Sequence, residues 1–408
     1  MPRSSTDPSF NLRTECGAGQ HGGDPNHAGP VQPAVSGHGG RSLREGIARM
    51  DGVIPAAGLA DQNSRALSGG RQHASGTGCA DGDTFRNAGG GEPGRGPRFD
   101  AIVPPGGYLW WYVDGLSDCG TYGLSVIAFV GSVFSPYYHW AGRRDPDNHV
   151  CINVALYAPY GNRWTMTERG RKQASRDAVS FQVGPSHIRR DGAEIVIEFD
   201  EVSVPRPPSQ WLPKRVKGVI RFSPDAVTSQ VFDIDAEGKH RWWPVSPTGR
   251  INAQFETGGD DWSGHGYMDS NRGTEPLEQG FSLWDWARGR VPTGDAVIIY
   301  DTTRKDGSQG EIAIRIGTDG EVSAIPMPAR TPLPNGFWGV PRLGHHDPSA
   351  KPTLSRTLED GPFYTRSVIR TRLLSETIDM MHESLSGKRF ASPIVKAMLP
   401  FRMPRRAG

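Results

Sequence analysis

The sequence predicts an all-β protein, either a sandwich or a barrel. Over residues 98–386, short runs rich in Val, Ile, Phe and Tyr recur at fairly regular spacing, and Gly, Asp and Pro separate them. One run, "HVCINVALYAP" at 149–159, alternates apolar residues and predicts a half-buried strand. Short strands divided by turn residues at this spacing are typical of sandwiches and barrels.

The expected strands follow one another along most of the chain. They cover residues 108–116, 122–134, 149–159, 163–170, 178–184, 194–204, 215–224, 229–236, 280–289, 295–303, 311–320 and 322–328. A weak break near "RFSPDAVTSQ" suggests two blocks, 98–230 and 231–386. Late in the second block, "TRSVIRTRLLSETIDMMHES" at 365–384 predicts a helix, because four apolar residues fall near one helical stripe: Val368, Leu373, Ile378 and Met381.

Residues 1–97 differ from the rest in composition. They are rich in Gly, Ser, Asp, Arg and His and nearly free of aromatic residues, so we expect a disordered leader. A marginal helix is predicted within it, where Leu43, Ile47, Met50 and Ile54 follow helical spacing. The leader lacks the apolar core of a secretory signal. No apolar run is long enough to form a membrane-spanning helix.

Charge and cysteine content narrow the function classes. The formal net charge is only +2, which gives no general affinity for nucleic acid. The four cysteines show no CxxC spacing, so we expect free thiols in a reducing compartment: Cys16, Cys79, Cys119 and Cys151.

Two short motifs carry the side chains best suited to chemistry. "KHRWWPVSP" contains His240 and Trp242, and "GHGYMDSNRG" contains Tyr267 and Asp269. Each pair is separated by one residue, the spacing at which two side chains share a face of a β-strand. If both motifs are strands, the four side chains converge on one side of a sheet.

These residue types together suit the protonation of an alkene. A carboxylic acid in an apolar barrel interior is desolvated, so its pKa rises and it can hold a proton near neutral pH. Nearby Trp and Tyr faces stabilise a cation by about 0.5–2 kcal/mol per good contact. The acid would protonate the alkene, the aromatic faces would shelter the carbocation, and water would capture it, without a metal or a redox cofactor.

Other interpretations of these motifs are open. Asp269 is also the kind of residue that forms a turn, and the tryptophans and His240 are also typical of a core. A glycan-active sandwich would need a second carboxylate about 5–9.5 Å away, for which the looser candidates are Asp260, Asp261 and Glu275. A metal site at His265, or at His345, His346 and Asp347, is not expected, because adjacent strand residues point to opposite faces.

Three long, aromatic-rich stretches resemble a known family. They are "YLWWYVDGLSDCGTYGLSVIAFVGSVFSPYYHWAGRRDPDNHVCINVALYAP", "HRWWPVSP" and "GHGYMDSNRGTEPLEQGFSLWDWARG". They are similar to the acyclic carotenoid 1,2-hydratases of phototrophic bacteria, also called hydroxyneurosporene synthases. The resemblance runs from about residue 99 to residue 386, and the leader looks like a lineage-specific extension outside it.

The resemblance implies a fold and a reaction. The fold would be two consecutive lipocalin-like β-barrel domains, at 98–230 and 231–386. The reaction would hydrate the terminal C1–C2 double bond of an acyclic carotene such as neurosporene or lycopene, without a cofactor. The product, a tertiary 1-hydroxy carotenoid, would feed spheroidene or spirilloxanthin synthesis. A non-catalytic carotenoid or lipid carrier on the same barrels is the alternative.

The resemblance also implies which residues act. The family's H-x-W and Y-x-D pairs fall on His240 and Trp242 and on Tyr267 and Asp269. Asp269 is then the candidate general acid, with His240 tuning or reprotonating it or activating water. Trp242 and Tyr267 would hold the cation.

The C-terminal segment predicts a membrane contact. Residues 387–408 carry six cations and no acidic residue, with apolar residues interleaved. Such a basic amphipathic tail suits either an interfacial anchor or a solvated basic tail. Because a carotene stays in lipid, we expect a peripheral protein on the cytoplasmic side of the inner or photosynthetic membrane, with no nucleic-acid partner. The sequence does not indicate the oligomeric state.

Overall fold

The structure is a computed structural model, and it describes residues 91–92, 96–207 and 210–406. Almost all of the predicted disordered leader, including the marginal helix at 43–54 and Cys16 and Cys79, lies outside the described residues. Cys151 is a buried free thiol, as expected. Within the described ranges, no helix is long and apolar enough to cross a membrane.

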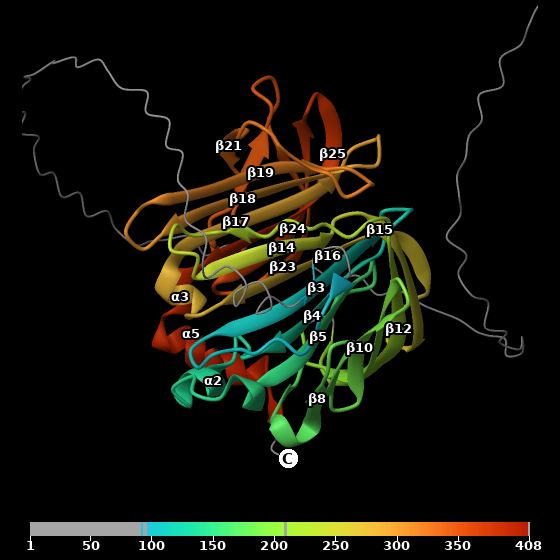
Figure 1. Ribbon diagram of the computed structural model, residues 1–408, viewed down its shortest axis with the longest axis vertical. Coiled ribbons are helices and arrows are strands. Elements are labelled where there is room, and N and C mark those ends of the chain that lie inside the picture. Colours follow the sequence, from blue (N-terminus) through green and yellow to red (C-terminus); the bar gives the residue numbers. More distant parts are fainter. Residues whose placement is uncertain (1–90, 93–95, 208–209, 407–408) are drawn as a thin grey trace, which may run out of the picture. The chain divides into compact units, whose positions relative to one another are not determined.

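Two sheets, antiparallel except for one parallel pair at the edge of the larger sheet, form most of the described chain, so the all-β fold class is confirmed. Figure 1 shows strands β17 to β19 of the smaller sheet, in orange, above strands β14, β16 and β3 of the larger sheet, whose strands β8 to β12 curl away on one side. The larger sheet has the order β26 (Arg405–Arg406), β7 (Glu168–Arg169), β5 (Val150–Tyr157), β4 (Gly123–Val130), β3 (Tyr108–Ser117), β16 (Trp262–Gly273), β15 (Gly249–Thr257), β12 (Lys214–Pro224), β11 (Glu194–Ser203), β10 (Ser186–Asp191), β9 (Ser180–Val183) and β8 (Ala174–Arg176).

Three further strands attach to the larger sheet beside this path. They are β6 (Arg163–Met166) on β5, β14 (His240–Ser246) on β16, and β13 (Phe232–Asp233) on β14. The smaller sheet has the order β20 (Val322–Ala324), β19 (Gln309–Ile316), β18 (Ala296–Arg304), β17 (Phe281–Arg290), β25 (Glu376–Ser386), β24 (Tyr364–Leu373) and β23 (Thr353–Asp360).

Short elements complete the described chain. Two-stranded pairs are formed by β1 (Gly91–Glu92) with β2 (Gly96–Pro97) and by β21 (Ala329–Pro332) with β22 (Leu343–His346). The helices are α2 (Pro136–Trp140), α3 (Leu277–Gly280), α4 (Gly387–Phe390) and α5 (Pro393–Met398), with 3-10 turns at Pro146–Asn148, Arg171–Gln173 and Leu399–Phe401.

The central strands of the larger sheet are buried on both faces. In β3, Trp111 and Val113 point into the core enclosed by the curl of the sheet. The alternate residues Tyr108 and Tyr112 point into a second core, shared with residues of the smaller sheet. The half-buried strand predicted at 149–159 was therefore wrong in one respect: every residue of β5 is buried, because the smaller sheet covers its other face.

The helix predicted at 365–384 was also wrong, because this segment forms the hairpin of β24 and β25. Leu374 and Ser375 connect the two strands with φ angles of 54° and 66°. Positive φ at both central residues is the geometry of a two-residue hairpin turn. Val368, Ile369 and Ile378 suit a strand better than a helix, and the pairing with β17 decides in favour of the strand. The helical residues near this end are in α4 and α5, beyond the predicted range.

Strands after residue 231 belong to both sheets. β16 pairs with β3 from Gly264 opposite Ser117 to Gly273 opposite Tyr108, so residues 240–273 complete the larger sheet. The chain enters the smaller sheet only at Phe281. The division into two domains at residue 230 stays a prediction, since sheet membership alone does not define a domain.

The close approach of β16 to β3 predicts a cost for any side chain at Gly264. A Cβ there would lie 2.0 Å from the backbone oxygen of Leu116, which cannot move without disturbing the ladder. We expect Gly264→Ala to lower the free energy of unfolding by roughly 1–3 kcal/mol in urea denaturation. Ser263→Ala, at the exposed neighbouring position, should stay within about 0.5 kcal/mol of the wild type. Equal stability of both variants would contradict the observed pairing.

Candidate active site

Asp269 lies on the face of β16 that meets the smaller sheet. It is directly opposite Tyr112 of β3, and Tyr267 precedes it on the same face. Trp242 comes from β14, which pairs with β16 on the other side. The strand periodicity anticipated from the sequence therefore brings three of the four predicted residues together.

One oxygen of Asp269 accepts two hydrogen bonds. Trp242 donates through Nε1 at 3.0 Å and Tyr267 through its hydroxyl at 2.7 Å, both to Oδ2. The other oxygen, Oδ1, is buried and has no hydrogen-bond partner among the described residues. Only 3% of Asp269 is exposed, so the carboxyl group is almost entirely removed from water.

Burial raises the pKa of Asp269 to about 8. The two donors at Oδ2 favour the charged form and lower the pKa, but desolvation outweighs them. At neutral pH the group is therefore protonated. Since Oδ2 already accepts two hydrogen bonds, the proton is on Oδ1, where no protein acceptor holds it. This is the arrangement of a general acid with its proton free for a bound molecule.

Aromatic rings from both sheets surround this carboxyl group. The Trp242 ring lies 4.7 Å from that of Tyr300 in β18, and the Tyr267 ring lies 5.4 Å from that of Trp286 in β17. Sequence reasoning treated Trp286 as core and did not single out Tyr300. The alternation of Trp284 and Trp286 in "GFSLWDWARG" was the available signal for an aromatic strand face, but only the sheet packing shows what it faces.

His240 belongs to a neighbouring set of contacts. Its Nδ1 is 2.9 Å from the Tyr108 hydroxyl, its Nε2 is 3.4 Å from Glu275 Oε1, and its backbone N–H donates to Asp235 at 2.6 Å. Burial lowers the pKa of the imidazole, so His240 is neutral at pH 7. None of these contacts is with Asp269. The resemblance implied that His240 tunes or reprotonates Asp269 or activates water, and these roles stay predictions.

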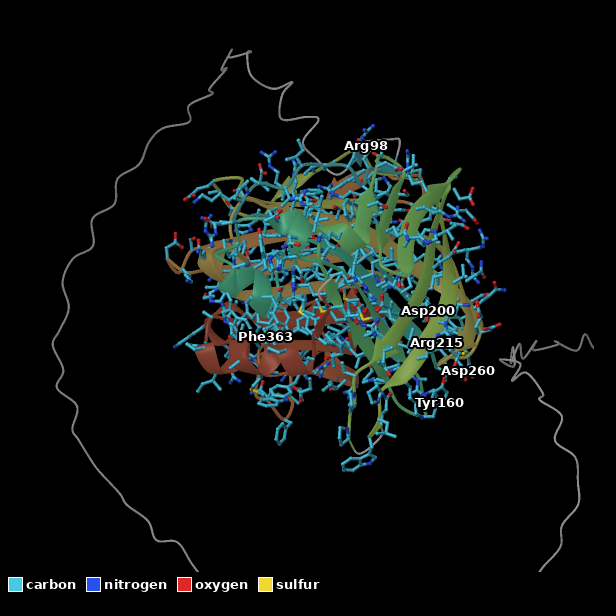
Figure 2. The ribbon with its side chains drawn as sticks, turned by 90° about the horizontal axis from the view of Figure 1, so that it is seen from below. Arg98, Tyr160, Asp200, Arg215, Asp260 and Phe363 are labelled. Carbon is cyan, nitrogen blue, oxygen red and sulfur yellow. The ribbon has the colours of Figure 1, made fainter. Side chains whose placement is uncertain are left out.

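A cavity of about 590 Å³ lies close to Asp269. This volume is within the range of small-molecule sites. Its lining is mostly aromatic and apolar, and includes Trp110, Phe129, Phe134, Trp164, Phe363, Met398 and Phe401. Asp269 does not line it, but Tyr112 does, and Tyr112 is the cross-strand neighbour of Asp269. Figure 2 shows Phe363 beside the C-terminal helical segment, whose residues Met398, Leu399 and Phe401 line this side of the cavity.

The cavity also has a charged part that sequence reasoning missed. Arg366 on β24 pairs with Glu383 of β25 at 2.7 Å and with Glu359 of β23 at 3.1 Å, and all three side chains line the cavity. Arg366 and Glu383 lie within the segment that the sequence predicted as a helix. A helix would have separated them from each other, so the helical period assigned to this segment gave no sign that they form an ion pair.

The other sequence candidates have ordinary structural partners. Nε2 of His345 is 3.2 Å from Asp301, and Nε2 of His346 is 2.8 Å from the Thr331 hydroxyl. Asp261 accepts the backbone N–H of Phe255 at 2.7 Å, as a turn residue does. Among the residues that the structure describes, no three His, Cys, Asp or Glu side chains are grouped so that they could bind a metal ion.

Comparison with known proteins identifies the family. Residues 126–408 match the family model described as carotenoid hydratase CrtC. The chain belongs to the carotenoid hydratase family. The acyclic carotenoid 1,2-hydratase of Thiocapsa roseopersicina is 48% identical, and that of Rubrivivax gelatinosus 45%, and each alignment covers 93% of this chain and 93% of the relative.

The hydratase alignments also bear on the leader, which the sequence predicted to be a lineage-specific extension. Residues 98–408 could not supply 93% of this chain, so the matches to the first two relatives extend into residues 1–97. The acyclic carotenoid 1,2-hydratase of Cereibacter sphaeroides, 39% identical, is matched over 99% of its own length but over only 69% of this chain, so the extension is present in some relatives and not in others. Among solved structures, kievitone hydratase from Nectria haematococca has a TM-score of 0.44 at 11% identity, over 74% of this hydratase and 100% of that chain. That likeness is too weak to bear on function.

The buried acid predicts a pH-dependent stability. Between its unfolded pKa of about 3.9 and its folded value of about 8, Asp269 is ionised only when the chain unfolds. Stability from this group is fully present below pH 4 and declines as the pH rises to about 8. The unfolding free energy of Asp269→Asn minus that of the wild type should rise by about 1.4 kcal/mol per pH unit over this interval. Parallel pH profiles from denaturant titrations would show that Asp269 is ionised in the folded protein.

Proposed function

We propose that this chain hydrates the terminal C1–C2 double bond of an acyclic carotene, such as neurosporene or lycopene, to a tertiary 1-hydroxy carotenoid. Family membership and the names of the relatives supply the substrate class and the reaction. The observation that carries the mechanism is the protonated Asp269, with Oδ2 held by two donors and Oδ1 free.

The first step is proton transfer from Oδ1 of Asp269 to C2. The π electrons of the double bond form the new C2–H bond, and the positive charge develops on C1, the more substituted carbon. The hydrogen bonds from Trp242 and Tyr267 stabilise the carboxylate that remains, so they assist the transfer. For the same reason they lower the pKa of Asp269.

The carbocation would lie against the aromatic faces of both sheets. Each good ring face stabilises a cation by about 0.5–2 kcal/mol, and more where water is excluded. Trp242, Tyr300 and Trp286 are all buried and lie around the acid. Water then adds to C1, and its oxygen releases one proton, which completes the tertiary alcohol.

We propose a positioning role for His240 rather than a role in proton transfer. Its contact with Tyr108 supports a ring that stacks on Trp110 at 4.9 Å, and Trp110 lines the cavity. Loss of His240 would therefore disturb the cavity wall.

The carotene would enter the cavity with its end group leading. Trp338, Met398 and Phe401 line the cavity and are also exposed, so they mark its outer end. Tyr112 lines the cavity and lies across the strand pair from Asp269. Because Asp269 itself does not line the cavity, the Tyr112 ring must shift for the double bond to reach Oδ1.

Asp269→Asn should abolish hydration while leaving pigment binding. The amide keeps the size and polarity of the acid but cannot protonate carbon, so we expect at least a hundredfold loss of turnover. The assay is incubation with lycopene in H₂¹⁸O and mass spectrometry of the labelled alcohol. Wild-type activity should also fall above pH 8, where Asp269 loses its proton. Full turnover by the variant would remove Asp269 from the mechanism, whereas pigment binding without labelled alcohol from the wild type would favour the carrier alternative.

We further propose that the protein contacts the membrane surface, on the cytoplasmic side of the inner or photosynthetic membrane, at the outer end of the cavity. Phe401 is 84% exposed and Ile394 74%, and Ile394 lies one helical turn before Met398. The apolar side chains at this end would enter the lipid headgroup region.

Positive charge in the tail is less available than the sequence suggested. Lys396 pairs with the buried Glu278 at 2.9 Å, and Arg405 pairs with Glu168. Arg389 donates to the carbonyl oxygens of Trp338 and Gly339, and Arg402 lies 4.5 Å over the Trp164 ring. Phe390 and Met403 are buried, so deletion of residues 387–408 would also disturb the fold. Point variants test the contact more cleanly.

Phe401→Ser and Ile394→Ser should each weaken binding to anionic vesicles by about tenfold. Removing a Phe or Ile side chain from lipid costs about 1.5–3 kcal/mol, and 1.4 kcal/mol is a factor of ten. Ile102→Ser is the matched control, because Ile102 is 86% exposed and does not line the cavity. Cosedimentation at low and high salt measures all three. Equal binding by the variants and the control would place the membrane contact elsewhere.

A further inference from the structure

A buried cluster of charged and phenolic groups forms one part of the otherwise apolar cavity. The Arg366 guanidinium lies 5.6 Å from the ring centres of Tyr112 and Tyr364, and its partners are Glu383 and Glu359. Arg366 is fully buried, and 18% of the Glu383 side chain is accessible. An apolar hydrocarbon end group gives no reason for this cluster, so we consider the second reactant, water.

The cluster extends to further charged groups on both sides. The pair of Arg288 and Asp114 adjoins it through Tyr112, whose hydroxyl contacts both Asp114 and Glu383. Arg402 also lines the cavity and interacts electrostatically with Glu359. Glu383 shares the Arg366 guanidinium with Glu359.

The Tyr112 hydroxyl lies between two of these carboxylates. Its oxygen is 2.7 Å from Asp114 Oδ2 and 3.0 Å from Glu383 Oε1, but it has only one proton to donate. When that proton goes to Asp114, the shorter of the two contacts, Glu383 is free to accept a hydrogen bond from a bound molecule. Since Glu383 lines the cavity, that molecule can be a water.

A polar group for holding water lies beside Glu383. The Tyr364 hydroxyl is buried and has no hydrogen-bond partner among the described residues, and Tyr364 and Glu383 both line the cavity. A water between them could donate to Glu383 and accept from Tyr364. Glu383 and Tyr364 belong to the smaller sheet, whereas Asp269 belongs to the larger sheet.

We propose that Glu383 is a second catalytic residue, the base that takes the proton from the attacking water. This inference rests on the proposed function. Asp269 protonates C2 and becomes a carboxylate. The water oxygen forms its bond to C1, and one of its protons passes to Glu383. The products are the tertiary alcohol, ionised Asp269 and protonated Glu383, and return of that proton to Asp269 completes the cycle. Arg366 and Tyr112 act as positioning residues for Glu383.

The two carboxylates are separated by running the reaction with lycopene in D₂O. Wild-type enzyme should form the alcohol with deuterium at C2. Glu383→Gln keeps an acceptor for Arg366 but is a poor base, so hydration should fall about a hundredfold. Protonation still occurs in this variant, and a cation that is not captured loses a proton again. The recovered carotene should therefore gain deuterium. Asp269→Asn should yield neither product.

Two further variants complete the design. Asp379→Asn removes an exposed carboxylate of the same strand, paired with Arg370, and should behave as wild type. Tyr112→Phe keeps the ring but removes the hydroxyl that contacts Glu383, so hydration should fall while deuterium exchange persists. This variant decides the question if Glu383→Gln has a lowered melting temperature.

The outcomes distinguish this inference from the proposed function. Wild-type hydration by Glu383→Gln would overturn the role of Glu383, and so would loss of exchange together with hydration in both Glu383→Gln and Tyr112→Phe. Absence of alcohol in the wild-type reaction, or deuterated product from Asp269→Asn, would instead overturn the proposed function and its acid.

Discussion

The closure of the smaller sheet over the strand pair of β3 and β16 is the constraint on which the site depends. In an isolated half-barrel the outer face of β16 would be wet, and Asp269 would be an ordinary ionised carboxylate. Strands β17 and β18 place Trp286 and Tyr300 over that face and exclude water from it. The desolvation raises the pKa of Asp269 to about 8, so the carboxyl group carries a proton at neutral pH. The contact between the sheets that buries the core therefore also sets the protonation state of the proposed acid.

The same interlayer space holds two carboxylates in opposite environments. Asp269 has only neutral donors, and burial keeps it protonated. Glu383 has the guanidinium of Arg366 beside it, at 2.7 Å. Different surroundings for two carboxyl groups are a general way of dividing acid and base roles within one site. The acid comes from the larger sheet and the proposed base from the smaller one, so neither sheet alone forms the site.

Such a site reduces stability. Below its folded pKa, Asp269 keeps a proton that the unfolded chain would release, and Oδ1 is left without a partner in an apolar layer. The aromatic packing around Trp242 and Tyr267 must offset this cost. Substitutions that replace the buried carboxyl group of Asp269 are expected to stabilise the fold and abolish hydration. This is the usual relation between stability and activity at a functional site.

The sequence by itself determined the all-β class, because alternating β-branched and aromatic residues between turn residues leave few other options. It also determined that Tyr267 and Asp269 share a face, and that His240 and Trp242 do, since residue spacing of two requires this on a strand. That Trp242 meets Asp269 depends on the register of β14 on β16. It did not determine the hairpin of β24 and β25, because Val368 and Ile378 fit both periods until β17 pairs with β25. Nor did it determine that His240 contacts Tyr108 instead of Asp269, or that Arg366 meets Glu383 at the cavity. The two residues of each contact lie far apart in the sequence or are brought together by strand register. Only the pairing of the strands and the packing of one sheet on the other decide which side chains meet.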